Sequence, residues 1–222
     1  MSAAIITLLL AHLIADYPLQ TDWLVKAKRT WPGLTLHASV HLVTVLALCL
    51  PYTAMLWPYL LTLGAVHFGI DAFKNLLAAR RPQWIAGPYL FDQLLHLASI
   101  WLIAAWAVAT LPGGWPIERP WQLYAIGFLF VTKVWQITER VLFHDDEGYQ
   151  RELMRMGTSR MVARVLLLAL WLLLGQPFDS ARPLAGAAAL WPYFVSSAYG
   201  RRALFTDLGV TMVVAALIWL VT

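Results

Sequence analysis

The sequence is poor in charge and in cysteine, and both shortages restrict the class of protein. Aspartate, glutamate, lysine and arginine make up only 13% of the 222 residues, whereas hydrophobic residues make up 60%. Soluble globular domains contain about 25% charged residues, so this composition excludes an ordinary soluble domain. The single cysteine, Cys49, lies in an apolar run and has no second cysteine to pair with, which leaves disulfide and redox chemistry without support. The sequence therefore indicates an integral membrane protein.

The motifs of several enzyme classes are missing as well. The sequence contains no glycine-rich phosphate loop, no GxSxG nucleophile elbow and no paired-cysteine zinc knuckle, which are the usual sequence signals of nucleotide, serine-hydrolase and zinc-knuckle sites. The net charge of +4 fits a membrane protein whose basic residues set its orientation, and we expect no nucleic-acid partner. No basic segment precedes the first apolar run, so we expect that run to remain as a helix and not to be cleaved as a signal peptide.

Long apolar runs predict an all-α fold, a polytopic bundle of transmembrane helices. A helix needs about 20 residues to cross the hydrocarbon core. We expect about eight spans, or seven if an interrupted run does not cross: 3–24, 33–50, 58–79, 88–111, 121–141, 161–175, 184–200 and 203–221. Pro18 interrupts the first run, the sixth run is short, and Pro192 lies in the seventh. The absence of an internal repeat or a linker favours a single membrane domain over residues 1–222.

Basic residues follow alternate spans. They gather after the first, third, fifth and seventh runs, as Lys26, Lys28, Arg29, Arg80, Arg81, Arg140, Arg151, Arg155, Arg160, Arg201 and Arg202. The opposite connections carry only Arg119 and Arg182. Because loops rich in lysine and arginine stay on the cytoplasmic side, we expect the odd-to-even connections in the cytoplasm and both termini outside.

Histidine and aspartate recur in pairs within the first four spans. Each pair is four residues apart, as in His12 and Asp16, His37 and His41, His67 and Asp71, and Asp92 and His96. Residues i and i+4 lie on one face of a helix, and the alternating direction of the spans would bring all eight side chains toward the cytoplasmic side. His12, His41, His67 and His96 would form a deeper layer. Residues 1–111 are therefore expected to form a four-helix core around a metal site, and residues 112–222 to support it, with a cytoplasmic segment over 144–160.

A divalent transition metal is the cofactor that this ligand set favours. Imidazole and carboxylate together suit zinc, with manganese or iron as alternatives, and two layers one helical turn apart would suit two ions. A single histidine or aspartate in a membrane helix often only forms a hydrogen bond with a neighbouring helix. Three clustered aspartates, however, would repel one another unless cations were bound. Two other hypotheses remain open: a transporter or channel for metal ions or protons, and a noncatalytic protein with a structural metal.

Residues beside the pairs suggest a hydrolytic reaction. Asp16 or Asp92 would take a proton from a metal-bound water, and Lys26 or Lys74 would stabilise the charge that develops on the substrate. A site at this depth favours a lipid-linked or amphipathic anionic substrate that enters from the inner leaflet of the bilayer. The sequence does not indicate an oligomeric state.

The segment HLIADYPLQTDWLVKAK resembles the N-terminal signature of a family of bacterial inner-membrane proteins of unknown function, and HLVTV, HFGIDAFK and DQLLH fall at the expected polar positions of that family. This resemblance covers about the first hundred residues and implies location in the bacterial inner membrane. The HxxxD pairs are more distantly similar to inner-membrane metal-dependent hydrolases and to the zinc phospholipase C and P1 nuclease group. That similarity implies a multinuclear metal site, phosphoester hydrolysis and ligand roles for His12, Asp16, His67 and Asp71, whereas the other two pairs depart from the HxxxD pattern.

Overall fold

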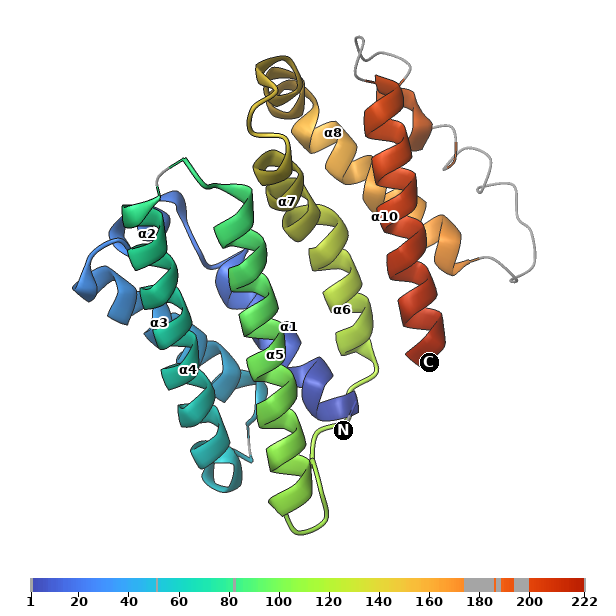
Figure 1. Cartoon of the computed structure of the whole chain (residues 1–222). Coiled ribbons are helices and arrows are strands. Elements are labelled where there is room, and N and C mark those ends of the chain that lie inside the picture. Colours follow the sequence, from blue (N-terminus) through green and yellow to red (C-terminus); the bar gives the residue numbers. More distant parts are fainter. Residues whose placement is uncertain are drawn as a thin grey trace. The chain divides into compact units, whose positions relative to one another are not determined.

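The computed structural model describes residues 2–50, 52–81, 83–173, 186, 189–193 and 200–221, and the regular elements in these ranges are all helices (Figure 1). This confirms the all-α fold that the apolar runs predicted. The chain divides into two compact units, residues 1–122 and residues 123–222. All four histidine and aspartate pairs fall in the first unit.

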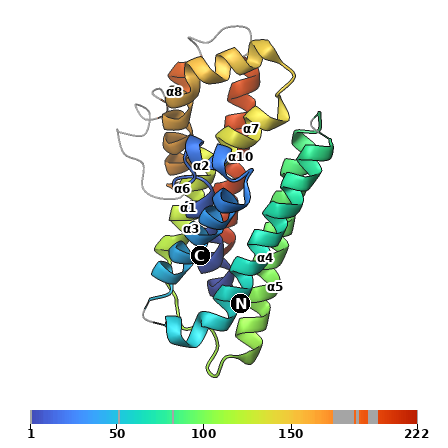
Figure 2. The same cartoon turned by 90° about the vertical axis from the view of Figure 1, so that its left-hand side faces the viewer.

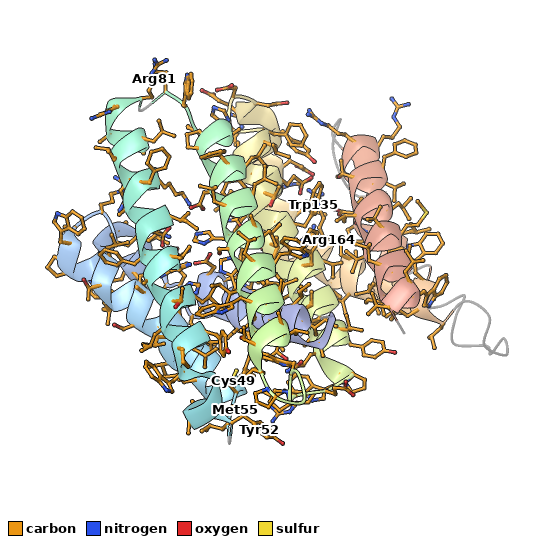
Figure 3. All side chains as sticks on the ribbon, turned by 60° about the horizontal axis from the view of Figure 1, so that its bottom comes forward. Cys49, Tyr52, Met55, Arg81, Trp135 and Arg164 are labelled. Carbon is orange, nitrogen blue, oxygen red and sulfur yellow. The ribbon has the colours of Figure 1, made fainter. Side chains whose placement is uncertain are left out.

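The first unit is built from five helices. These are α1 (Ser2–Asp16), α2 (Asp22–Ala27), α3 (Trp31–Leu48), α4 (Thr53–Arg80) and α5 (Ala86–Thr110). Helix α1 packs on α3 and α5, α3 packs on α4, and α4 packs on α5. Figure 2 shows α4 and α5 as a long antiparallel pair. In Figure 3, Arg81 lies just after the end of α4, and Tyr52 and Met55 mark its beginning.

The apolar core of the first unit lies in one half of the bundle. It contains residues near the start of α1 and α4 and near the end of α3 and α5, such as Leu8, Leu60, Val45 and Ala104, all at most 4% exposed. The histidine and aspartate pairs occupy the other half of the same helices. One end of the bundle is therefore an ordinary hydrophobic core, and the other end is available for polar chemistry.

The connection from α1 to α3 is set by its capping residues. The residue before a proline avoids helical geometry, and α1 ends at Asp16, two residues before Pro18. Thr21 and Thr30 then cap α2 and α3 by accepting hydrogen bonds from the backbone N–H groups of Leu24 and Gly33, each at 3.3 Å. A Cβ atom on Gly33 would lie only 2.0 Å from the carbonyl oxygen of Ala27, so glycine allows α2 to pack closely against the start of α3.

The second unit contains a buried network of charges. Its described helices are most of α6 (Trp121–Leu129), the π-helix η1 (Phe130–Val134), α7 (Trp135–Leu142), α8 (Glu147–Leu172) and α10 (Gly200–Val221). Arg160 donates to both oxygens of Asp207 at 2.8 and 2.9 Å and to Glu139 at 2.8 Å. Arg164 donates to the Val131 carbonyl oxygen within the π-helix and to Asp207. The positive and negative charges of this network balance, so it joins the helices of the unit without an excess charge.

The segment 144–160 is more regular than the sequence suggested. We expected a solvated cytoplasmic stretch around His144, Asp145 and Asp146, but α8 begins at Glu147, where Asp146 accepts a hydrogen bond from the Tyr149 backbone N–H at 2.9 Å. The helix forms because its polar first half still has a capping residue and because Tyr149 is fully buried. His144 only contacts its neighbours, the Val141 carbonyl oxygen and Asp145.

The prediction of about eight spans is wrong for the described residues, where four helices are long and apolar enough to cross a membrane: α3, α4, α5 and α10. The predicted span 3–24 is divided between α1, which has 15 residues, and the short α2. The predicted span 121–141 is divided by the π-helix, and α8 carries too many polar residues over its length. The predicted span 184–200 lies largely outside the described residues. The four helices indicate a membrane protein, while the placement of both termini outside stays a prediction.

Candidate metal centre

All eight sequence-predicted ligands meet in the first unit. Helices α1, α3, α4 and α5 each contribute one pair, and each of the eight residues is at most 8% exposed. The pairs converge because residues four apart lie on one helical face and because all four helices turn that face toward the same interior. Their side chains therefore form a single cluster, which we call the His/Asp cluster.

Asp16 joins α1 to α3. Its Oδ1 atom lies 3.0 Å from His41 Nε2 and 3.2 Å from His37 Nε2, and its Oδ2 atom lies 3.4 Å from His12 Nε2. Asp71 plays a similar part between α4 and α3, since its Oδ2 atom lies 3.1 Å from His37 Nε2. A single carboxylate from α1 and one from α4 thus reach the same histidine.

The cluster contains three groups of residues whose ligand atoms lie within 4.8 Å of one another. The first group is Asp16, His37, His41 and His67, the second is His12, His67 and His96, and the third is Asp71, Asp92 and His96. The first and third groups share no residue, so ions at these two positions would not compete for the same ligands. These groups cut across the two predicted layers, because Asp16 of the shallow layer lies beside His41 of the deep layer.

Three buried atoms of the third group have no hydrogen-bond partner among the described residues. They are Asp71 Oδ2, Asp92 Oδ1 and His96 Nε2, one from each member of the group. Asp92 Oδ1 and His96 Nε2 are 3.4 Å apart, and Asp71 Oδ2 lies 3.1 Å from His37 Nε2 and 3.3 Å from His67 Nε2, but none of these contacts is a well-aligned hydrogen bond. A buried polar atom without a partner costs roughly 1–3 kcal/mol. A bound cation would satisfy all three atoms, so the residues present fit a metal ion.

Two lysines lie beside the carboxylates of the third group. Lys74 Nζ donates to Asp92 Oδ2 at 2.5 Å, and Lys28 Nζ lies 3.9 Å from Asp71 Oδ1. Lys28 also donates to Gln20 Oε1 at 2.5 Å, and its own carbonyl oxygen accepts from Asn75 Nδ2 at 2.7 Å. The side chain of Lys28 is 14% exposed and that of Lys74 is 26% exposed, so both are mostly buried. They place positive charge beside two carboxylates of the third group.

Sequence reasoning named Lys26 beside the cluster, but the lysine of this segment that approaches Asp71 is Lys28. The side chain of Lys26 is exposed on α2, whereas Lys28 lies at the C-cap of that helix. The carbonyl contact with Asn75 holds the turn after α2 against α4. Helical periodicity does not predict where a side chain in such a turn lies. The only sequence signal for Lys28 was that it is close in the chain to the aspartate pairs.

A small cavity adjoins the His/Asp cluster on the side of the apolar core. Its volume is about 20 Å³, and its lining includes His12, His41, His67 and His96 together with apolar residues such as Leu8. A cavity needs a volume of about 10–15 Å³ and several polar partners to hold one water molecule. The cavity therefore has room for one water-sized molecule against four imidazole rings.

The fold and the cluster together define a class: an all-helical protein with membrane-length helices and a buried group of histidines and aspartates. Within that class the chain belongs to the family described as "Protein of unknown function (DUF3307)", whose model matches residues 4–114. The matched region contains α3, α4, α5 and all eight residues of the His/Asp cluster. No curated protein and no solved structure matches the chain.

Proposed function

We propose that this protein is an integral membrane hydrolase that uses two divalent transition-metal ions to cleave a phosphoester in a lipid-linked or amphipathic substrate. The observation that carries the proposal is the third group, in which one buried atom of each of Asp71, Asp92 and His96 lacks a hydrogen-bond partner. Four nearby residues offer a second set of ligands. The similarity of the HxxxD pairs to metal-dependent hydrolases agrees with this chemistry.

The two ligand groups differ in the number of residues that they supply. Asp16, His37, His41 and His67 supply four ligands, the number that fills the coordination sphere of a structural zinc site. Asp71, Asp92 and His96 supply three ligands, which leaves a position for water, as in catalytic zinc sites. This ligand chemistry favours zinc and also accepts manganese or iron.

The residues around the open position have distinct roles in the proposed reaction. A metal ion held by Asp71, Asp92 and His96 would lower the pKa of a water molecule and polarise the phosphoryl group. Asp16 or Asp92 would accept the proton of the attacking water; Asp16 Oδ1 lies beside two histidines, and Asp92 Oδ2 accepts a hydrogen bond from Lys74. Lys74 and Lys28 donate to the phosphoryl oxygens as negative charge develops there. His12 contacts Asp16 Oδ2 and orients that carboxylate.

We also propose that the protein lies in the bacterial inner membrane and that the His/Asp cluster lies toward the cytoplasmic side. Lys28 and Arg29 follow α2, and Arg80 and Arg81 end α4, at the end of the bundle that holds the His/Asp cluster. The positive-inside rule places that end in the cytoplasm. The other half of the first unit is the apolar core around Leu8 and Leu60. This closed apolar half favours an enzyme over a transporter, which would need a polar path through it.

Metal analysis of the purified protein tests the proposal. We expect about two transition-metal ions per chain and hydrolysis of bis(p-nitrophenyl) phosphate, and we expect the His96→Gln variant to lose one ion and most of the activity. His144→Gln is the matched control, because His144 is the one histidine outside the His/Asp cluster. Wild-type protein without stoichiometric metal would refute the proposal, as would a His96→Gln variant with full metal content and activity.

A further inference from the structure

Two adjoining hollows open beside the His/Asp cluster, along the seam between α3 and α4. One has a volume of about 270 Å³ and is lined by Arg29, Thr30, Trp31, Leu34, Ala72, Asn75 and Leu76. The other has a volume of about 360 Å³ and is lined by Arg29, Asn75, Ala78 and Ala79. Because they share Arg29 and Asn75, we treat them as one groove, the α3–α4 groove. Sites for small ligands commonly have volumes of about 300–1,000 Å³.

The walls of the groove are amphipathic. Arg29 is exposed, and among the described residues no carboxylate lies within ion-pair distance of it. Opposite this charge the lining is apolar: Leu76 is 49% exposed, and Trp31, 70% exposed, stacks on Phe68 with ring centroids 6.0 Å apart. An unpaired guanidinium suits a phosphate group, and exposed tryptophan at the end of a membrane helix suits the boundary between headgroups and acyl chains.

The groove and the His/Asp cluster share a wall. Ala72 in the groove follows the cluster residue Asp71, and Leu34 lies one turn before His37. Asn75 lines the groove and donates to the carbonyl oxygen of Lys28, whose Nζ atom lies 3.9 Å from Asp71 Oδ1. Arg29, which would hold the ligand phosphate, follows Lys28 directly in the chain, so the groove borders the residue that approaches Asp71.

We infer that the α3–α4 groove binds an anionic phospholipid, with the lipid phosphate on Arg29 and an acyl chain along Trp31, Leu34 and Leu76. The charge and the apolar wall together select this ligand, because a free phosphate would leave the apolar wall unused and a neutral lipid would leave Arg29 without a partner. The inference rests on the proposed function in one respect, since the groove would deliver the substrate of the metal centre. It identifies the substrate class as an anionic phospholipid of the inner leaflet.

Native mass spectrometry of the detergent-purified protein tests the inference, with dioctanoyl-phosphatidylglycerol as the ligand. Loss of one charge-assisted hydrogen bond should weaken binding by about tenfold, so Arg29→Gln is expected to lower the affinity by that factor. Ala79→Trp, which fills the groove, should lower it as well. Arg81→Gln is the matched control, because Arg81 stacks over Trp84 at 4.8 Å outside the groove lining. Its affinity should equal that of the wild type.

Three results would overturn the inference: unchanged affinity in both groove variants, equal binding of dioctanoyl-phosphatidylcholine, or displacement of the lipid by inorganic phosphate at the same concentration. Circular dichroism of each variant shows whether it is folded, and Arg29→Gln changes only an exposed side chain. None of the groove residues is a proposed metal ligand. Lipid binding that depends on Arg29 in a protein without metal would therefore support the groove and refute only the proposed hydrolase.

Discussion

Buried histidine and aspartate side chains are costly in helices of this kind, because each aspartate placed at the centre of a membrane helix costs about 2.5–3.5 kcal/mol on insertion scales. In the His/Asp cluster, contacts between residues offset part of this cost. Asp16 and Asp71 each lie within 3.3 Å of two histidines. The remaining cost lies with the atoms of Asp71, Asp92 and His96 that form no hydrogen bond, and the cation that we propose would offset it.

The two lysines near α2 give a sharp test of the proposed charge stabilisation. Lys28 is directed at Asp71, whereas Lys26 is exposed. Removing a group that stabilises developing charge lowers kcat by about a hundredfold in well-studied sites. We therefore expect Lys28→Gln to lower kcat for the phosphodiester about tenfold to a hundredfold with its metal content unchanged.

Lys26→Gln serves as the control for this prediction and should retain the wild-type kcat. Metal analysis of both variants separates an effect on the reaction from loss of the ions. Equal kcat values for the two variants would show that Lys28 has no part in the reaction.

The individual helices follow the sequence closely where one periodicity governs them. The apolar runs 33–50, 58–79 and 88–111 became α3, α4 and α5 with ends shifted by five residues or fewer. Departures occur where local chemistry competes with hydropathy, as at Pro18, at the π-helix and at the capped start of α8. Hydropathy averages over a long window, and it therefore misses a break or a cap set by one or two residues.

The contact between α2 and α3 makes a prediction for two glycines. A Cβ atom on Gly33 would meet the Ala27 carbonyl oxygen at 2.0 Å, whereas one on Gly69 in α4 would meet no atom within 4 Å. Gly33→Ala should displace α2 and destabilise the protein by roughly 1–3 kcal/mol. Gly69→Ala should stabilise it by about 0.5–1 kcal/mol, because alanine is the better helix former.

Thermal unfolding followed by tryptophan fluorescence in detergent measures both glycine variants. The two variants are expected to change the stability in opposite directions, so each serves as the control for the other. A Gly33→Ala protein as stable as the wild type would contradict the close packing of α2 on α3. Because Lys28 ends α2, the same variant should also lower kcat if the protein remains folded.

The molecule contains two sets of buried polar residues, one in each of its two units. The first unit, residues 1–122, contains the whole His/Asp cluster and all of the region matched by the family. The second unit contains the balanced network of Arg160, Arg164, Asp207 and Glu139. Removing one partner from a buried charge pair costs roughly 3–5 kcal/mol, so loss of any one member of this network would destabilise the second unit.

This division predicts that the two units behave differently when expressed separately. A fragment of residues 1–122 should bind the same number of transition-metal ions as the full chain, and a fragment of residues 123–222 should bind none. Metal content after gel filtration in detergent measures this. Asp92→Asn in the 1–122 fragment is the control and should bind less metal. Stoichiometric metal in the 123–222 fragment would contradict the assignment of the ligands.

The spacing of four residues between paired ligands and the length of the apolar runs were enough to predict helices, a shared site and its eight members. These are local properties, because helical periodicity fixes which residues share a face whatever the surroundings. Only the tertiary structure decided how the eight divide into groups, that Lys28 and not Lys26 approaches Asp71, and that Arg160 and Arg164 meet Asp207. Those contacts join residues far apart in the chain, and they depend on how helices cross, where turns end and which rotamers the packing allows.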